Sequence, residues 1–333
     1  MLKKVQMLNA IAILASFSCF GAIKASPPAE QEVIWRIPND IESRDLFYGV
    51  GGQEHQPRGS FRFIEEDMDG TNPKFTIEDE DGVRWKVKLG DEVRSETAAS
   101  RFLWAVGYFT DEDYFVASLR VGDMPRLKRG QKFVEHDGTI RNARMERHVN
   151  GQEKTGKWRW RDYRAGGREI NGLRVMMALL NNWDLKDVNN RVFDTLAGGE
   201  EYGITDLGAT FGRTGNVITR SKGVSKDYAQ TKFIADVTAT HVDFVMQSRP
   251  FLPLVLYPSH YRSRTRMERL VKHVPLADAR WIGDRLGRLS AEQIRDAFRA
   301  SGFSPADIEV YTQVVVTRIR ALQDLSPQVS HSF

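Results

Sequence analysis

Residues 181–190 read Asn-Asn-Trp-Asp-Leu-Lys-Asp-Val-Asn-Asn, and residues 205–212 read Thr-Asp-Leu-Gly-Ala-Thr-Phe-Gly. The first segment places Asp184 five positions before Asn189, and the second places Asp206 two positions before a glycine. Between them, two short runs at 191–193 and 202–204 flank Ala197-Gly198-Gly199 and predict a β-hairpin. Such a hairpin would bring Asn189 and Asp206 side by side, so that one divalent cation could bind oxygens of both.

The chain before these segments predicts mainly strands. Residues 60–64 alternate in polarity, as do residues 73–78 and 83–89, and the last two runs flank Asp79-Glu80-Asp81-Gly82. An Asp-Gly turn between alternating runs is a strong hairpin signal. In the run 83–89, the apolar side chains share one face, and Lys86 and Lys88 share the other.

Helices are predicted next to these strands and in the last third of the chain. Ser95 is suited to cap a helix that ends at Gly107, with Glu96 near its buried stripe. A helix from Glu169 to Trp183 would deliver the chain to Asp184. Three more are predicted at 276–289, at 290–302 (opened by a capping box) and at 304–325.

This order of elements predicts an α+β fold. We expect a β-rich N-terminal lobe over residues 46–135, a mainly helical C-terminal lobe over 136–325 and a tail over 326–333. The stretch Lys157-Trp158-Arg159-Trp160-Arg161 predicts an exposed strand, with grip on a phosphate or a base as the alternative. A basic run is expected to be a solvated face, with an anionic acceptor or a membrane surface as the alternative; it comprises Arg262, Arg264, Arg266, Arg269 and Lys272.

The N-terminus has the pattern of a signal peptide. Lys3 and Lys4 precede an apolar run from Ala10 to Ala22, and Ala25-Ser26 follows. We therefore predict a signal peptide over residues 1–25, with an uncleaved anchor as the alternative, and a periplasmic or secreted protein without a membrane span after cleavage. Residues 26–45 are rich in proline and charge and predict a loosely held lead-in.

Composition excludes some classes of function. Cys19 is the only cysteine, so a processed chain would hold no thiol nucleophile and no zinc–thiolate site. The net charge is +4, and removal of Lys3, Lys4 and Lys24 leaves 45 basic and 44 acidic residues. The net charge therefore gives no indication of a nucleic-acid partner.

The polar residues fit the needs of phosphoryl transfer. That reaction needs a base to align the acceptor hydroxyl, a metal that bridges the phosphates and a cation on the phosphate oxygens. Asp184 suits the base, Asn189 and Asp206 suit the metal, and Lys88 or Lys86 suits the phosphates. Glu96 would orient the lysine, so we expect Lys88 to approach Glu96.

These motifs resemble the divergent branches of the protein kinase-like superfamily, over roughly residues 80–215. Asp184-x-x-x-x-Asn189 is similar to the catalytic loop of HipA-type toxin kinases and phosphatidylinositol kinases. The segment 206–212 is similar to the Asp-Asn-Gly-x-x-Phe segment of type II phosphatidylinositol kinases and the secretory-pathway casein kinases. Val87-Lys88-Leu89, followed by Glu96 on a helix, is similar to the HipA pattern of strand lysine and helix glutamate.

The resemblance implies a two-lobed kinase-like fold with ATP and Mg²⁺ between the lobes and an acceptor hydroxyl on a protein, lipid or sugar. It implies Asp184 as catalytic base, Asn189 and Asp206 as metal ligands, and Lys88 as the phosphate lysine paired with Glu96. The chain departs from ordinary kinases because no His-Arg precedes Asp184 and no Gly-x-Gly-x-x-Gly is present. Gly49, Gly51 and Gly52 are a partial substitute for that nucleotide-binding loop, with Lys86 as the alternative phosphate lysine.

Two other functions compete with this one. An exported binding or scaffold protein that kept the fold and lost turnover is favoured by the missing loop and by the scarcity of ATP in an exported compartment. A metal-dependent hydrolase could use Asp184, Asp187 and Asp206, but the histidines that such sites recruit are scattered, at positions 55, 136, 148, 241, 260, 273 and 331. A Ser-His-Asp hydrolase has no Gly-x-Ser-x-Gly elbow to support it.

Overall fold

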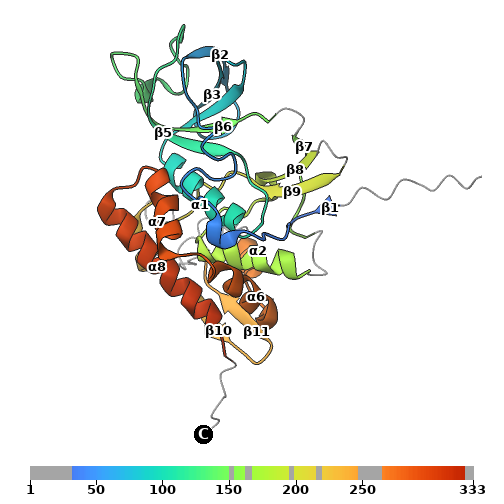
Figure 1. The fold of residues 1–333 in the computed structure, drawn as a ribbon. Helices are drawn as coiled ribbons and strands as arrows, with labels where there is room; N and C mark the ends of the chain where they lie inside the picture. Colours follow the sequence, from blue (N-terminus) through green and yellow to red (C-terminus); the bar gives the residue numbers. More distant parts are fainter. Residues whose placement is uncertain are drawn as a thin grey trace, which may run out of the picture.

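The computed structural model describes residues 32–149, 154–161, 167–194, 199–214, 220–246 and 265–326. It has an α+β fold, with a β-rich N-terminal part and a mainly helical C-terminal part (Figure 1). The predicted signal peptide, Arg262 and Arg264 lie outside the described residues, as does nearly all of the predicted tail. Among the helices of the described ranges, none is both long and apolar enough to cross a membrane.

A five-stranded antiparallel sheet forms the N-terminal part. Its strands lie in the order β2-β3-β4-β6-β5, with bounds β2 (Phe61–Asp67), β3 (Lys74–Asp79), β4 (Arg84–Leu89), β5 (Asp113–Leu119) and β6 (Ile140–Arg147). The predicted β3–β4 hairpin is present, with Ile77 opposite Trp85. In its turn, Asp79 Oδ1 accepts hydrogen bonds from the backbone N–H groups of Asp81 and Val83. One face of the sheet packs around Phe75, Trp85, Val87 and Met145 as a separate apolar core.

Helix α1 (Val93–Ala105) packs on the other face of this sheet and against the C-terminal helices (Figure 1). Strand β6 lies past residue 135, so the N-terminal part extends beyond the predicted boundary, because β6 pairs with both β4 and β5. A short 3-10 helix, η2 (Gln131–Phe133), precedes β6.

The described part of the predicted lead-in, residues 32–45, is not loosely held. Strand β1 (Glu32–Val33) pairs in parallel with β9, and Ile41, in the 3-10 helix η1 (Ile41–Ser43), is fully buried. The ring of Trp35 meets that of Trp281 edge to face at 5.1 Å. This segment therefore contributes to the main apolar core.

The C-terminal part carries two small sheets beside its helices. One has the order β1-β9-β8-β7 and contains the predicted hairpin, β8 (Asn190–Asp194) and β9 (Glu200–Ile204), with β7 (Lys154–Gly156) at its edge. The other has the order β10-β11-β12, with β10 (Ile234–Val237), β11 (His241–Phe244) and β12 (Val274–Pro275). The sequence analysis did not predict this second sheet.

The helices predicted after α1 are present with shifted ends, as α2 (Arg168–Leu179), α6 (Leu276–Leu286), α7 (Ala291–Ala300) and α8 (Pro305–Gln323). Two helical segments were not predicted, namely α3 (Ser225–Ala229) and a stretch at 265–270. The predicted capping box of α7 is present, because Ser290 and Gln293 each accept a backbone hydrogen bond from the other. The prediction for Trp158 and Trp160 is wrong: both are only 3% exposed and pack together in the core, where Trp158 Nε1 donates to the Gly203 carbonyl.

Candidate functional site

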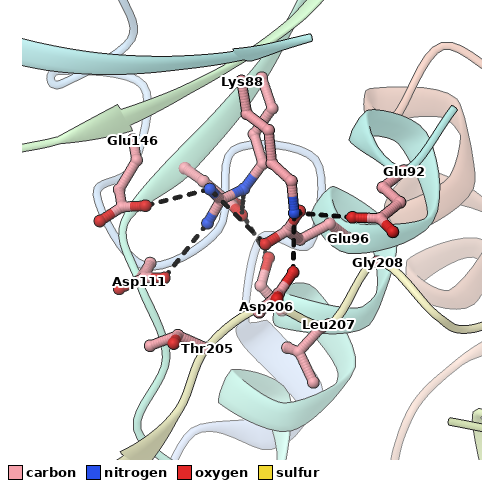
Figure 2. Close-up of polar contacts among 12 residues, drawn as sticks. Lys88, Glu92, Glu96, Asp111, Glu146, Thr205, Asp206, Leu207 and Gly208 are labelled. Atoms are coloured by element: carbon pink, nitrogen blue, oxygen red, sulfur yellow. Dashed lines mark hydrogen bonds and ion pairs between the residues drawn. The ribbon is translucent and has the colours of Figure 1, made fainter. Parts of the chain in front are cut away.

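Lys88 and Glu96 meet at the face of the sheet that α1 covers. Because Trp85, Val87 and Leu89 fill the opposite face, Lys88 points toward the helix. Its Nζ lies 2.6 Å from Glu96 Oε2 and 2.9 Å from Glu92 Oε2 (Figure 2). The expected contact between Lys88 and Glu96 is present, and Glu92, which the sequence analysis did not single out, provides a second carboxylate.

Asp206 provides a third carboxylate at the same ammonium. Its Oδ1 lies 2.8 Å from Lys88 Nζ, although the two residues are 118 positions apart (Figure 2). The backbone at Asp206 has a φ of 53°, in the left-handed region that few non-glycine residues adopt. Its side chain is half exposed, so this carboxylate faces both Lys88 and solvent.

Residues 207–212 are fastened to α1 and to the helical core, which fixes Asp206. Ser95 does not cap α1, which begins at Val93. Instead, its hydroxyl donates to the carbonyls of Glu92 and Gly208, while Thr210 donates to the Ser95 carbonyl. The ring of Phe211 is fully buried among the aromatic side chains of Phe102, Tyr228, Phe298 and Tyr311. Asp206 therefore leads a rigid segment.

The charges of these four side chains are strongly coupled. Burial alone would lower the pKa of the Lys88 ammonium, but the carboxylates of Glu96, Glu92 and Asp206 outweigh it and raise that pKa. Burial alone would raise the pKa of Asp206, yet Lys88 lowers it below its usual range. At the fully buried Glu96, desolvation wins over Arg144 and Lys88 and raises the pKa. Lys88 is thus held charged by two ionised neighbours and a third carboxylate.

A second buried ion cluster supports Glu96 from the sheet. Arg144 Nε lies 2.7 Å from Asp113 Oδ2, and its other nitrogens reach Asp111 at 3.3 Å, Glu146 at 3.1 Å and Glu96 at 3.7 Å. In Figure 2, Asp111 and Glu146 lie on one side of Lys88 and Glu96, and Glu92 lies on the other side. The sequence analysis missed these residues. Apolar and charged residues alternate over 143–146, because Ala143 and Met145 are apolar and Arg144 and Glu146 are charged. This alternation could have indicated that Arg144 and Glu146 share one face of a strand.

Asp184 and Lys88 line the same cavity. Asn189, at the end of the 3-10 helix η3 (Asp187–Asn189), donates from Nδ2 to the Asp184 carbonyl at 2.8 Å. Its own carbonyl accepts from the backbone N–H of Thr205 at 2.9 Å, which places it beside the residue before Asp206. The amide oxygen Oδ1 is thus the atom that could ligate a cation. The Asp184 carboxylate lies 2.8 Å from Lys186 Nζ, whereas Asp187 accepts a hydrogen bond from the Trp160 backbone N–H.

A cavity of about 300 Å³ is lined by Lys88, Asp184 and Asp206, but not by Asn189. Its walls contain nine basic side chains, from Lys74, Lys86, Lys88, Arg144, Lys154, Lys186, Arg191, Arg220 and Lys222, and six acidic ones, from Glu92, Glu96, Asp111, Glu146, Asp184 and Asp206. Arg220 and Lys222 also lie over the ring of Trp183, at 5.0 and 5.4 Å from its centre. The excess of basic side chains suits an anionic ligand.

The glycines predicted to bind nucleotide do not line this cavity. Gly49 and Gly51 pack against the side chains of Arg101, Glu112 and Tyr114, and Tyr114 donates to the Gly52 carbonyl. The turn between β2 and β3 contributes Gly70, Thr71 and Asn72 instead. Which loop reaches the cavity depends on sheet order and cannot be seen in local composition.

The two lysines of β4 have different surroundings. The Lys86 side chain is 43% exposed, and its Nζ lies 3.3 Å from Asp67 Oδ2. The Lys88 side chain is 8% exposed and is surrounded by three carboxylates. Of these two lysines, Lys88 is therefore the buried one.

The carboxylates could also hold a metal ion. Glu92, Glu96 and Asp206 each offer an oxygen, and these three oxygens lie within 4.8 Å of one another. An all-oxygen set of this kind suits a hard cation such as Mg²⁺. Lys88 Nζ sits among them, as a positive charge in the place that a cation would take.

Comparisons with known proteins give structural likenesses only. No protein-family model matches the chain, and no curated protein does. Among solved structures, the chain is similar to a Helicobacter pylori proinflammatory kinase, CtkA, with a TM-score of 0.44 and 10% identity over 81% of this chain and 95% of that one. It is also similar to a Golgi casein kinase, with a TM-score of 0.34 and 9% identity over 85% of this chain and 84% of that one. What this chain does must therefore be inferred from its own residues.

Proposed function

We propose that this protein is an exported, kinase-like phosphotransferase that moves a phosphoryl group from ATP, with Mg²⁺, to a hydroxyl of a protein, lipid or sugar. The observation that supports this most is the contact of Lys88 with both Glu96 and Asp206. A strand lysine paired with a helix glutamate, beside an Asp-x-Gly aspartate, is the arrangement that phosphoryl transfer in kinases requires. Export rests on the sequence of residues 1–25.

Each polar group then has a task. Lys88, released in part from its carboxylates, would bind phosphate oxygens, and Glu96 would keep it in place. Asp206 and the Asn189 amide oxygen would hold Mg²⁺, which neutralises charge on the phosphates. Asp184 would accept the proton of the acceptor hydroxyl as its oxygen bonds to the γ-phosphorus and the bond from that phosphorus to ADP breaks. Lys222 and Arg220 add positive charge at the rim.

One observation favours the alternative, a binding or scaffold protein without turnover. Glu92 accepts hydrogen bonds from Asn72 and Lys222 and also contacts Lys88. Glu92 thereby holds one amide group and two ammonium groups that could otherwise bind a phosphate. While Glu92 keeps that position, its carboxylate competes with a phosphate for Lys88.

Titration with Mg·ATP distinguishes the two. If the protein is a phosphotransferase, the wild type should release or absorb heat on binding Mg·ATP. Asp206→Asn should lose Mg²⁺-dependent binding and turnover. The melting temperature of Asp206→Asn should differ little from that of the wild type, because the half-exposed carboxylate contributes about 0–1 kcal/mol to the free energy of unfolding. Asp187→Asn, an acidic residue of the neighbouring segment that does not line the cavity, is the matched control.

Two results decide against the proposal. An Asp206→Asn variant as active as the wild type would exclude the metal role of Asp206. A wild type that shows neither heat nor a thermal shift at millimolar Mg·ATP would support the scaffold.

A further inference from the structure

We propose that His241, Asp243 and His273 form a binding site for a divalent first-row transition metal ion, with Zn²⁺ as the reference ion, on the β10-β11-β12 sheet. Each residue offers one ligand atom, and the three atoms lie within 4.8 Å of one another. None of the three lines the cavity around Lys88. The site is therefore independent of the proposed phosphotransfer.

Strand geometry brings the three residues together. His241 and Asp243 alternate with Val242 and Phe244, which are fully buried, so the polar pair shares the outer face of β11. In the antiparallel pairing, His241 faces Pro275 and Val242 faces Val274. His273 directly precedes β12, and its backbone N–H donates to the Asp243 side chain, which places it beside Asp243. Two histidines that are 32 positions apart in the sequence thus converge, which corrects the expectation that all of the histidines are scattered.

Backbone contacts fix His273 in this place. Its backbone N–H donates to Asp243 Oδ1 at 2.7 Å, and its Nδ1 lies 3.3 Å from the same oxygen. Its φ is 53°, in the left-handed region. Residues in that region cost free energy and cluster at functional sites. The side chain is 76% exposed, which leaves a metal ion accessible to water or to a further ligand.

Two threonine hydroxyls lie beside one ring nitrogen of His241. Thr238 Oγ1 lies 3.0 Å from the His241 carbonyl, to which it donates, and 3.0 Å from His241 Nδ1. Thr240 Oγ1 lies 3.2 Å from the same ring nitrogen. Thr238 Oγ1 also accepts from the backbone N–H groups of Thr240 and His241. These contacts hold the His241 ring in place, and a histidine ligand commonly has such a partner on its second ring nitrogen.

The ligand chemistry selects the class of metal. Two imidazoles and one carboxylate suit Zn²⁺ and related ions, and three protein ligands leave a fourth position open. Tetrahedral ligand atoms at about 2.0–2.1 Å from Zn²⁺ lie about 3.3 Å apart, so the cluster needs a small closure, which the exposed His273 ring can provide. Lys272 Nζ lies 4.0 Å from Asp243 Oδ2 and 3.7 Å from Glu268, so it does not contact the oxygen that faces His273.

The test is titration of the full chain with Zn²⁺, and with Co²⁺ as a coloured substitute. We expect one site in the wild type and visible Co²⁺ bands of a low-coordinate complex. His273→Asn, which keeps a residue that tolerates positive φ, should weaken Zn²⁺ binding at least tenfold and abolish these bands, and His241→Ala should do the same. His136→Ala, a histidine of the exposed turn before β6, and Asp206→Asn, which alters the carboxylates around Lys88, should bind Zn²⁺ as the wild type does.

Equal Zn²⁺ affinity in the wild type, His273→Asn and His241→Ala would overturn the proposal, as would a wild type that binds no Zn²⁺ at submillimolar concentration. Loss of the bound ion in Asp206→Asn alone would place it among the carboxylates around Lys88 and would equally overturn it. Because His273 is exposed, its replacement should leave the circular dichroism spectrum unchanged, so that a fall in affinity reports a lost ligand.

Discussion

Replacement of Lys88 by methionine tests the central feature of this site. Methionine keeps much of the length of the side chain and removes its charge. The carboxylates of Glu92, Glu96 and Asp206, whose oxygens lie 2.6–2.9 Å from Nζ, would then face one another without the ammonium. We expect Lys88→Met to destabilise the protein and, in addition, to create a site for a divalent cation.

The magnitude follows from burial. The Lys88 and Glu96 side chains are 8% and 3% exposed, and breaking a buried ion pair by removing one partner costs about 3–5 kcal/mol. At about 2 °C per kcal/mol for a chain of this size, the melting temperature should fall by about 6–10 °C. Millimolar Mg²⁺ or Ca²⁺ should recover part of this loss, because the three carboxylate oxygens are close enough to bind one ion.

Lys86→Met is the matched control, since Lys86 lies on the same face of the same strand. Its side chain is 43% exposed beside Asp67, so its loss should cost about 0–1 kcal/mol and confer no response to Mg²⁺. Differential scanning calorimetry of both variants, with and without the ion, measures the effect. Equal melting temperatures for the two variants would refute the energetic argument. A destabilised Lys88→Met that ignores divalent ions would show that the ammonium does not occupy a cation position.

Three further changes test other contacts. Burial alone would raise the pKa of Glu92, but Lys88 and Lys222 lower it below its ordinary 4.5; this stabilisation is present above pH 4.5 and lost as the pH falls through the folded-state pKa. Glu92→Gln should therefore melt below the wild type at pH 7, and the difference in melting temperature should shrink as the pH falls below 4.5; a pH-independent difference would contradict this. Gly208→Ala would place its Cβ 2.5 Å from Glu92 Cβ, so urea unfolding should show a loss of about 1–3 kcal/mol, and an unchanged unfolding midpoint would disprove that close contact. Trp158→Ala should lose about 3–5 kcal/mol by the same measurement, against less than about 0.5 for the exposed neighbour Lys157→Ala; similar values for both would mean that Trp158 is not buried.

Local patterns predicted the elements that local chemistry controls. The Asp-Gly turn and alternating side chains specify the β3–β4 hairpin. The β8–β9 pairing places Asn190 opposite Ile204, and Asn189 and Thr205 are the next residues beyond this pair. The capping box of α7 formed where its sequence indicated. In each of these, the residues that determine the structure are neighbours in the chain, so their spacing is sufficient to predict it.

The identity of the buried lysine could not be predicted in this way. Lys86 and Lys88 are equivalent in the sequence of β4, and only the packing of α1 over one end of the strand encloses Lys88. The same packing brings Glu92 to it. Arg144 reaches Glu96 because β6 crosses back to pair with β4, a choice among strand pairings that depends on the whole sheet.

The sequence by itself determined which side chains are polar, which face of each strand they occupy and where turns break the chain, because these depend on residues a few positions apart. Only the tertiary structure decided which of those side chains meet. Asp206 joins Lys88 across 118 positions, the turn at 70–72 takes the place predicted for Gly49–Gly52, and His241 meets His273. Such contacts depend on burial and strand order summed over the entire fold, which no local spacing contains.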